Sequence, residues 1–184
     1  MKNLHHIVVI LLLFLSSFIA AQEVFVSSIS DYNKTIKTAK PGSVIVLKNG
    51  VWNDFKMNAF GDGIKGSPII VKAETPGKVF ITGNSTLNIS GNYVIVSGLW
   101  FKDGNPSFKS VVQFRNDAKE YANNCRFTNS TISYYKVKEG IKDHWVDLWG
   151  KNNRVDHNNF TGKTSPGTTL VVWLKGAEHI ENRH

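Results

Sequence analysis

The side chains best suited to bind a ligand lie towards the end of the chain, at His157, Asn159 and Lys163. In an extended strand His157 and Asn159 share one face, because successive side chains alternate. Lys163 follows a glycine, and the turn expected there could project its ammonium group into a groove. An imidazole, an amide and an ammonium group together suit an anionic ligand such as a sugar carboxylate. The alternative is that the first two residues pack at a corner of the fold and that the lysine is simply solvated.

Two further positions carry side chains that could contact a sugar, one basic and one aromatic. Arg115 alternates outward from Phe114 and could line the same face as the first group. The segment Lys142–Trp145 brings together charge, an imidazole and an aromatic ring. Trp145 could stack on a sugar ring, or it could pack inside the fold, and both interpretations stay open. These five residues (Arg115, Trp145, His157, Asn159 and Lys163) are the predicted substrate-binding residues.

The sequence does not favour a hydrolase site, a disulfide or a metal site. Asp143, Asp147 and Asp156 could suggest the paired carboxylates of a glycoside hydrolase, but they are not closely spaced and no two aspartates are adjacent. The single cysteine, Cys125, excludes an internal disulfide and alternates with Phe127, which predicts a buried thiol. No metal-ligand set is predicted within the chain.

The elements that must position these residues are short strands. Residues 83–101 hold several apolar alternations separated by Gly and Asn, with no room for a helix between them. Such a pattern predicts a β-solenoid, in which the chain coils on itself; a β-sandwich is the competing fold. Segments beginning at Asn92, Asn124 and Asn153 resemble one recurring unit ending at Phe101, Phe127 and Phe160. The turn asparagines could bond from one coil to the next.

One helix is predicted near the start. Ser30 or Asp31 could cap it and Pro41-Gly42 would end it. One face would carry Tyr32, Ile36 and Ala39. A solenoid exposes its core at each end, so we expect this helix to act as a lid.

Residues 1–21 read as a signal peptide, since a lysine precedes an apolar run of about 12 residues that is too short to span a bilayer. We therefore expect residues 22–184 to be secreted or periplasmic, with no membrane association after cleavage. That part carries 21 basic and 14 acidic side chains, a net charge of +7, which suits an anionic partner or simply aids solubility. Since no run of Lys or Arg and no nucleic-acid motif occurs, an anionic polysaccharide is favoured over nucleic acid. No oligomeric state is predicted.

After the strand expected at 168–174, Glu178–Asn182 begins what resembles a further coil, and the sequence stops at His184 without a closing helix. We therefore expect residues 22–184 to be the N-terminal coils of a longer β-helix.

The sequence resembles the chondroitinase B-like lyases of polysaccharide lyase family six. The resemblance rests on segments spread over residues 22–184, namely Ala39–Trp52, Pro68–Ala73, Gly77–Gly83, Ser97–Phe101, Asn153–Lys163 and Thr169–Leu174. The last two are most similar to the alginate lyases of that family. The resemblance implies a right-handed parallel β-helix that cleaves uronate polysaccharides by β-elimination.

The resemblance also implies that Ca²⁺ neutralises the sugar carboxylate, that a lysine abstracts the C5 proton and that an arginine assists the leaving oxygen. In the family a Glu-x-Glu pair precedes that lysine, and this sequence contains no such pattern. We therefore expect the catalytic residues and the calcium ligands beyond His184, and this chain alone to be inactive. Alginate is the favoured substrate, and chondroitin or dermatan sulfate and pectate are its rivals. A non-catalytic β-helix that binds polysaccharide or serves as an adhesin is the alternative.

Overall fold

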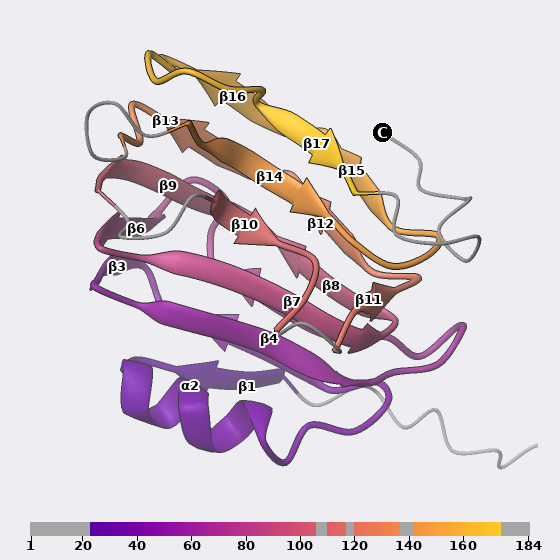
Figure 1. The fold of residues 1–184 in the computed structure, drawn as a ribbon. Coiled ribbons are helices and arrows are strands. Elements are labelled where there is room, and N and C mark those ends of the chain that lie inside the picture. Colours follow the sequence, from indigo (N-terminus) through magenta and orange to yellow (C-terminus); the bar gives the residue numbers. More distant parts are fainter. Residues whose placement is uncertain (1–22, 106–109, 117–119, 137–141, 174–184) are drawn as a thin grey trace, which may run out of the picture.

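The structure is a computed structural model that describes residues 23–105, 110–116, 120–136 and 142–173 (Figure 1). The predicted signal peptide at 1–21 and the coil expected at 178–182 lie outside these residues. The elements are β1 (Glu23–Val26), α2 (Ile29–Ile36), β2 (Val44–Leu47), β3 (Gly50–Asn53), β4 (Lys56–Asp62), β5 (Ile69–Ala73), β6 (Val79–Gly83), β7 (Thr86–Asn92), β8 (Val94–Ser97), β9 (Leu99–Gly104), β10 (Ser110–Gln113), β11 (Ala122–Asn123), β12 (Arg126–Thr128), β13 (Thr131–Ser133), β14 (His144–Leu148), β15 (Arg154–Asp156), β16 (Asn159–Thr161) and β17 (Leu170–Val172).

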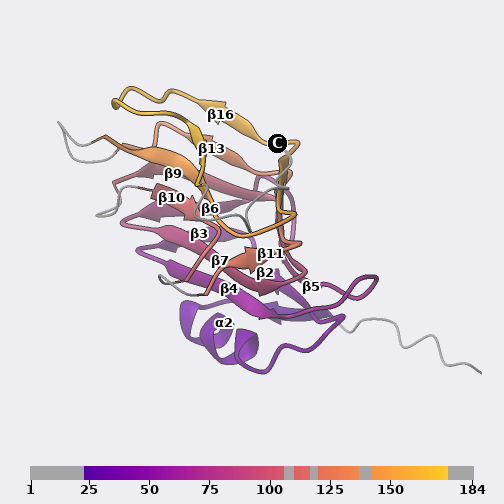
Figure 2. The same cartoon turned by 45° about the vertical axis from the view of Figure 1, so that its right-hand side comes forward.

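The strands form three parallel sheets that wind together into a β-helix of about four turns, as the sequence predicted (Figures 1 and 2). Sheet A has the order β1-β2-β5-β8-β12-β15, and sheet B has the order β16-β13-β9-β6-β3. Sheet C contains β4, β7, β10, β11, β14 and β17. In the described residues each pairing between these strands is parallel. A β-sandwich, which joins antiparallel neighbours, is therefore wrong for this chain.

The strand register gives the true length of each coil. In sheet A one row runs through Val44, Ile70, Ile95, Arg126 and Arg154, so successive coils span 26, 25, 31 and 28 residues. The longer coils carry insertions at their corners, as expected for a solenoid.

One equivalence drawn from the sequence is wrong. Phe101 stands in register with Ile132 and then with Phe160 on sheet B. Phe127 instead lies on sheet A, between Val96 and Val155. The three phenylalanines all point into the core, so spacing along the chain did not reveal which sheet each belongs to.

The core is a continuous column of inward-facing side chains. Leu87, Ile89, Val94, Val96 and Phe101 are fully buried, which confirms that residues 83–101 supply strands to the solenoid. Cys125 is buried as predicted, and its sulfur accepts a hydrogen bond from the Val94 amide at 3.3 Å. Burial raises the pKa of this thiol to about 11. Apolar burial along this column is the main force that holds successive coils together.

Helix α2 covers the N-terminal end of the column, below β1 and β4 in Figure 1. Tyr32 packs edge-on against Phe55, with ring centroids 5.1 Å apart, and its hydroxyl donates to the Asn58 carbonyl at 2.9 Å. The lid predicted from the sequence is confirmed, but its cap is not. Ser28, rather than Ser30 or Asp31, is the N-cap, and it accepts from the Asp31 amide at 3.1 Å.

Ser28 holds this position because a strand that the sequence analysis missed, β1, precedes the helix directly. Among the described residues, no helix has the length and apolar content needed to cross a membrane.

Asparagine side chains bond from coil to coil, as predicted. Asn88 donates to the Asn58 side chain at 3.1 Å, and Asn92 donates to Asp62 at 2.9 Å. Deeper in the fold, Asn153 accepts from the Cys125 amide at 2.9 Å and donates to the Ala122 carbonyl at 2.8 Å. These amides satisfy backbone groups at corners where the ladder hydrogen bonds are interrupted.

Candidate functional site

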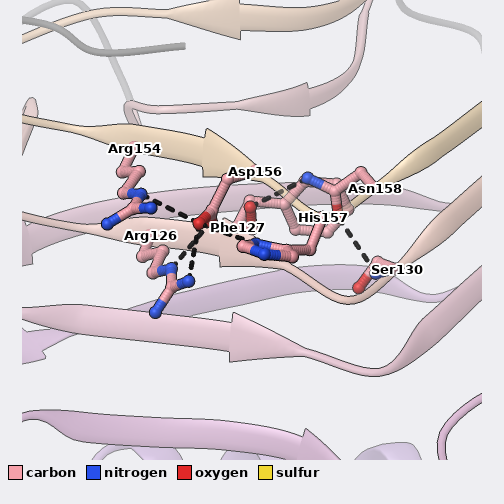
Figure 3. Close-up of polar contacts among 7 residues, drawn as sticks. All are labelled: Arg126, Phe127, Ser130, Arg154, Asp156, His157 and Asn158. Atoms are coloured by element: carbon pink, nitrogen blue, oxygen red, sulfur yellow. Dashed lines mark hydrogen bonds and ion pairs between the residues drawn. The ribbon is translucent and has the colours of Figure 1, made fainter.

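A charged group on sheet A contains one of the predicted residues, His157. We call Arg126, Arg154, Asp156 and His157 the Asp156 cluster (Figure 3). Arg126 holds both carboxylate oxygens, with Nε 2.7 Å from Oδ1 and Nη2 2.6 Å from Oδ2. Oδ2 also lies 2.8 Å from Arg154 Nε and 2.9 Å from His157 Nδ1.

The strand pattern explains why these charges meet. Phe127 and Val155 point into the core, so alternation turns Arg126, Arg154 and Asp156 to the outer face of sheet A. Arg126 and Arg154 are in register on adjacent strands, an arrangement that is unfavourable for like charges unless an anion lies between them. The bonded Arg126 guanidinium holds the pKa of Asp156 well below its usual range, and Asp156 in turn raises the pKa of Arg126.

The structure separates two residues that the sequence placed on one face. His157 directly follows β15 and has a φ of 55°, a left-handed conformation that turns the chain from sheet A to sheet B. Asn159 then begins β16, so the prediction that His157 and Asn159 share a strand face is wrong. The His157 side chain is 65% exposed. The corner is held by Asn158, which accepts from the Ser130 amide and donates to the Phe127 carbonyl, both at 2.9 Å.

Lys163 is neither solvated nor directed into an open groove. Its side chain is only 10% exposed, and Nζ lies 2.7 Å from Oδ1 of the fully buried Asp143. The same ammonium group donates to the carbonyl and hydroxyl of Ser165 at 2.9 and 3.0 Å. The expectation of a projecting lysine is therefore wrong, because the buried carboxylate of the preceding coil requires a cation.

Trp145 is completely buried, with its ring 6.4 Å from that of Phe160. Its indole faces the core and is not available to stack on a sugar, so the packing interpretation is the correct one for this residue.

Arg115 packs against a group of stacked aromatic side chains. Its guanidinium carbon sits 4.1 Å from the ring centroid of Trp149, and Nε donates to the Gln113 side chain at 3.3 Å. Trp149 is stacked between two other rings, 6.0 Å from Tyr121 and 5.2 Å from Trp173, with interplanar angles of 5° and 12°. We call these three rings the aromatic stack.

The sequence analysis missed the aromatic stack. Its rings are separated by 28 and 24 residues, close to one coil each, and that periodicity was the available signal. Tyr121 also lines an open pocket of about 340 Å³ together with Phe60, Asp62, Asn92 and Glu120.

A row of polar side chains crosses sheet C beside the stack. Asn58, Asn88, Gln113 and Asp147 are in register on successive strands, and their strand neighbours are buried apolar residues. Asp147 accepts from the Ser110 hydroxyl at 2.5 Å, and burial raises the pKa of its carboxyl. Amides, a guanidinium and aromatic rings on one face are the groups that bind sugar hydroxyls, carboxylates and ring faces.

The described residues do not fit a metal ion. They contain no group of three or more His, Cys, Asp or Glu side chains placed to bind one metal ion. The buried carboxylate of Asp143 is already neutralised by Lys163. We therefore assign no calcium-dependent step to this part of the chain.

The comparisons with known proteins agree with the fold. The sequence model of the chondroitinase B family matches residues 26–184. The solved structure of a mutant of AlyGC, a family 6 alginate lyase, is 38% identical over 85% of this chain, with a TM-score of 0.83. A mannuronic acid specific family 6 lyase from the human gut microbiota is 31% identical over 87% of the chain, with a TM-score of 0.77. A family 6 lyase from Pseudopedobacter saltans is 32% identical over 81%, with a TM-score of 0.74.

The matched region is only part of each relative. The chain covers 22% of the AlyGC chain, 38% of the gut enzyme and 34% of the Pseudopedobacter saltans enzyme. No curated protein sequence matches the chain.

Proposed function

Because the chain belongs to the chondroitinase B family of polysaccharide lyases, we propose that it supplies the N-terminal coils of an exported enzyme that cleaves alginate by β-elimination. The observation that carries this proposal is the 38% identity to a family 6 alginate lyase over 85% of the chain. Secretion or periplasmic location follows from the signal peptide predicted at 1–21. Chondroitin or dermatan sulfate and pectate are the rival substrates.

In this proposal the described coils bind the polymer and the chemistry takes place elsewhere. β-Elimination removes a weakly acidic proton next to a carboxylate, so it needs a base and a group that neutralises that carboxylate. The described residues offer no free lysine at the predicted site, since Lys163 is committed to Asp143. We place the base, the assisting arginine and the calcium ligands beyond His184.

The part assigned to this chain is the outer face of sheet C. Arg115 would pair with a uronate carboxylate, and the aromatic stack would pack against sugar rings. The net charge of +7 expected for residues 22–184 would favour association with a polyanion.

The test uses the product of the full reading frame. On alginate it should generate unsaturated uronate ends, detected by ultraviolet absorbance, and a chelator should reduce the rate. Chondroitin sulfate, dermatan sulfate and pectate, assayed in parallel, decide the substrate. The 184-residue chain alone should give no turnover, and clear turnover by it would refute our placement of the catalytic residues.

Within that product, Arg115→Gln should raise KM for alginate several-fold with little change in kcat. The matched control is Lys40→Gln, which removes one exposed positive charge from the loop between α2 and β2. Equal KM values for the two variants would show that Arg115 does not bind the substrate.

One observation favours a second candidate, a non-catalytic polysaccharide-binding β-helix. The 184 residues contain no Glu-x-Glu followed by a lysine. If the full reading frame also lacks that pattern, and no uronate polymer yields an absorbance change, the binding protein is the correct assignment.

A further inference from the structure

We propose that the Asp156 cluster is a second anion-binding site, which takes a carboxylate or sulfate group of an acidic polysaccharide on sheet A. This site is separate from sheet C and from Arg115, which lies just beyond β10 of that sheet. It is a binding site only, so it does not depend on the lyase activity proposed above.

The charges of the Asp156 cluster do not balance. One carboxylate faces two guanidinium groups and an imidazole, which leaves a surplus of at least one positive charge (Figure 3). A surface ion pair that served stability alone would need one cation for each carboxylate. Arg126 already pairs with both oxygens of Asp156, and each further exposed cation adds only about 0–1 kcal/mol, so stability gives little reason to gather Arg154 and His157 around the same acid.

The Asp156 cluster has more hydrogen-bond donors than its one carboxylate can accept. An arginine has five N–H donors. Arg126 uses Nε and Nη2 on Asp156, and Arg154 uses Nε, among the contacts found in the described residues. Both oxygens of Asp156 already accept from these groups. The two arginine side chains are 34% and 55% exposed, so their N–H groups that do not contact Asp156 could donate to an incoming anion.

The two arginines of the cluster are preorganised by Asp156. The Asp156 side chain is only 13% exposed, and it holds both guanidinium groups in place on neighbouring strands. Adjacent strands lie about 4.8 Å apart, so one incoming carboxylate or sulfate could reach both arginines. Because the side chains are already ordered by Asp156, binding would lose less conformational entropy than at a pair of free arginines.

The experiment measures the affinity of the purified chain for fluorescently labelled alginate oligomers. All variants carry Arg115→Gln, so that a change is assigned to sheet A. In that background, Arg154→Gln should weaken binding at least threefold more than the charge-matched control Lys40→Gln. Arg154→Lys should fall between them, since a lysine keeps the charge but loses the planar fork of donors.

Thermal unfolding of each variant verifies the fold. If Arg154→Gln does not fold, His157→Gln replaces it, because that side chain is 65% exposed at a corner. Equal affinity of the Arg154 or His157 variant and the control would overturn the proposal. So would equal competition by a DNA duplex of matched charge, which would indicate an unselective polyanion surface. Since no turnover is measured, these outcomes are independent of the lyase assay.

Discussion

At the scale of single residues, the location of a charge decided its role. Lys163 and Arg154 are both basic residues near turns, and the sequence favoured Lys163 as the ligand contact. Lys163 instead neutralises the buried carboxylate of Asp143, 20 residues earlier in the chain, while Arg154 remains more than half exposed. A buried charge without a partner is so costly that burial fixes the lysine in a structural role.

Asp156 should make stability depend on pH. Its folded pKa lies below the usual value, so its contribution is fully present above the unfolded pKa of about 3.9 and is lost as the pH falls towards the folded pKa. We expect Asp156→Asn to lower the free energy of unfolding by about 1–3 kcal/mol at pH 7. The difference from the wild type should shrink progressively below pH ~4.

Urea unfolding followed by tryptophan fluorescence at pH 7 and pH 3 measures both differences. A gap between wild type and variant that is equal at the two pH values would show that the carboxylate does not act through its charge.

At the scale of elements, α2 shows how a neighbouring strand shifts a helix boundary. Ser28, Ser30 and Asp31 are all acceptable caps by residue type. The pairing of β1 with β2 fixes the chain up to Val26, and the first helical turn then has to begin at once. Ser28 both accepts from the Asp31 amide and donates to the Asp31 carboxylate at 2.7 Å, forming a reciprocal cap.

The two serines provide a direct test of this cap. Ser28→Ala should destabilise the chain by about 1 kcal/mol, because an amide at the helix start loses its acceptor. Ser30→Ala, at an exposed helical position, should change stability by less than about 0.5 kcal/mol. Thermal or urea unfolding of both variants measures the difference, and the reverse order would restore the cap predicted from the sequence.

The close stacking of coils at the C-terminal end of β7 depends on glycine. Gly91 has a φ of 84°, and a Cβ there would fall on the carbonyl oxygen of Gly61 in the coil below. Gly66 has a similar φ of 87° but has no atom within 4 Å of the same position. A comparison of alanine substitutions at these two glycines therefore separates the cost of backbone strain from the cost of crowding between coils.

We expect Gly66→Ala to cost about 1 kcal/mol, from the left-handed backbone alone. Gly91→Ala should cost about 2–4 kcal/mol, since overpacking adds to that strain. Unfolding midpoints of the two variants test this, and equal midpoints would mean that the coils can separate at the corner without penalty.

At the scale of the whole molecule, the three sheets give each surface row a different chemistry. One row of sheet C carries amides and a carboxylate next to the aromatic stack, while one row of sheet A passes from Val44 to Arg154. Residues about one coil apart in sequence become neighbours in these rows. The proposed binding surfaces are therefore properties of the stacked coils, and no single strand contains one.

The sequence by itself determined the architecture, the N-terminal helical lid and the asparagine bonds between coils, and its resemblance to known lyases indicated the family. The first three features depend on local alternation and turn residues, which act within a few residues of each other. The tertiary structure alone decided which side chains meet. Arg126 reaches Asp156 across 30 residues, and Trp149 stacks on Tyr121 across 28. Coil lengths between 25 and 31 residues set those pairings, and corner insertions make them irregular enough that the sequence cannot give the register.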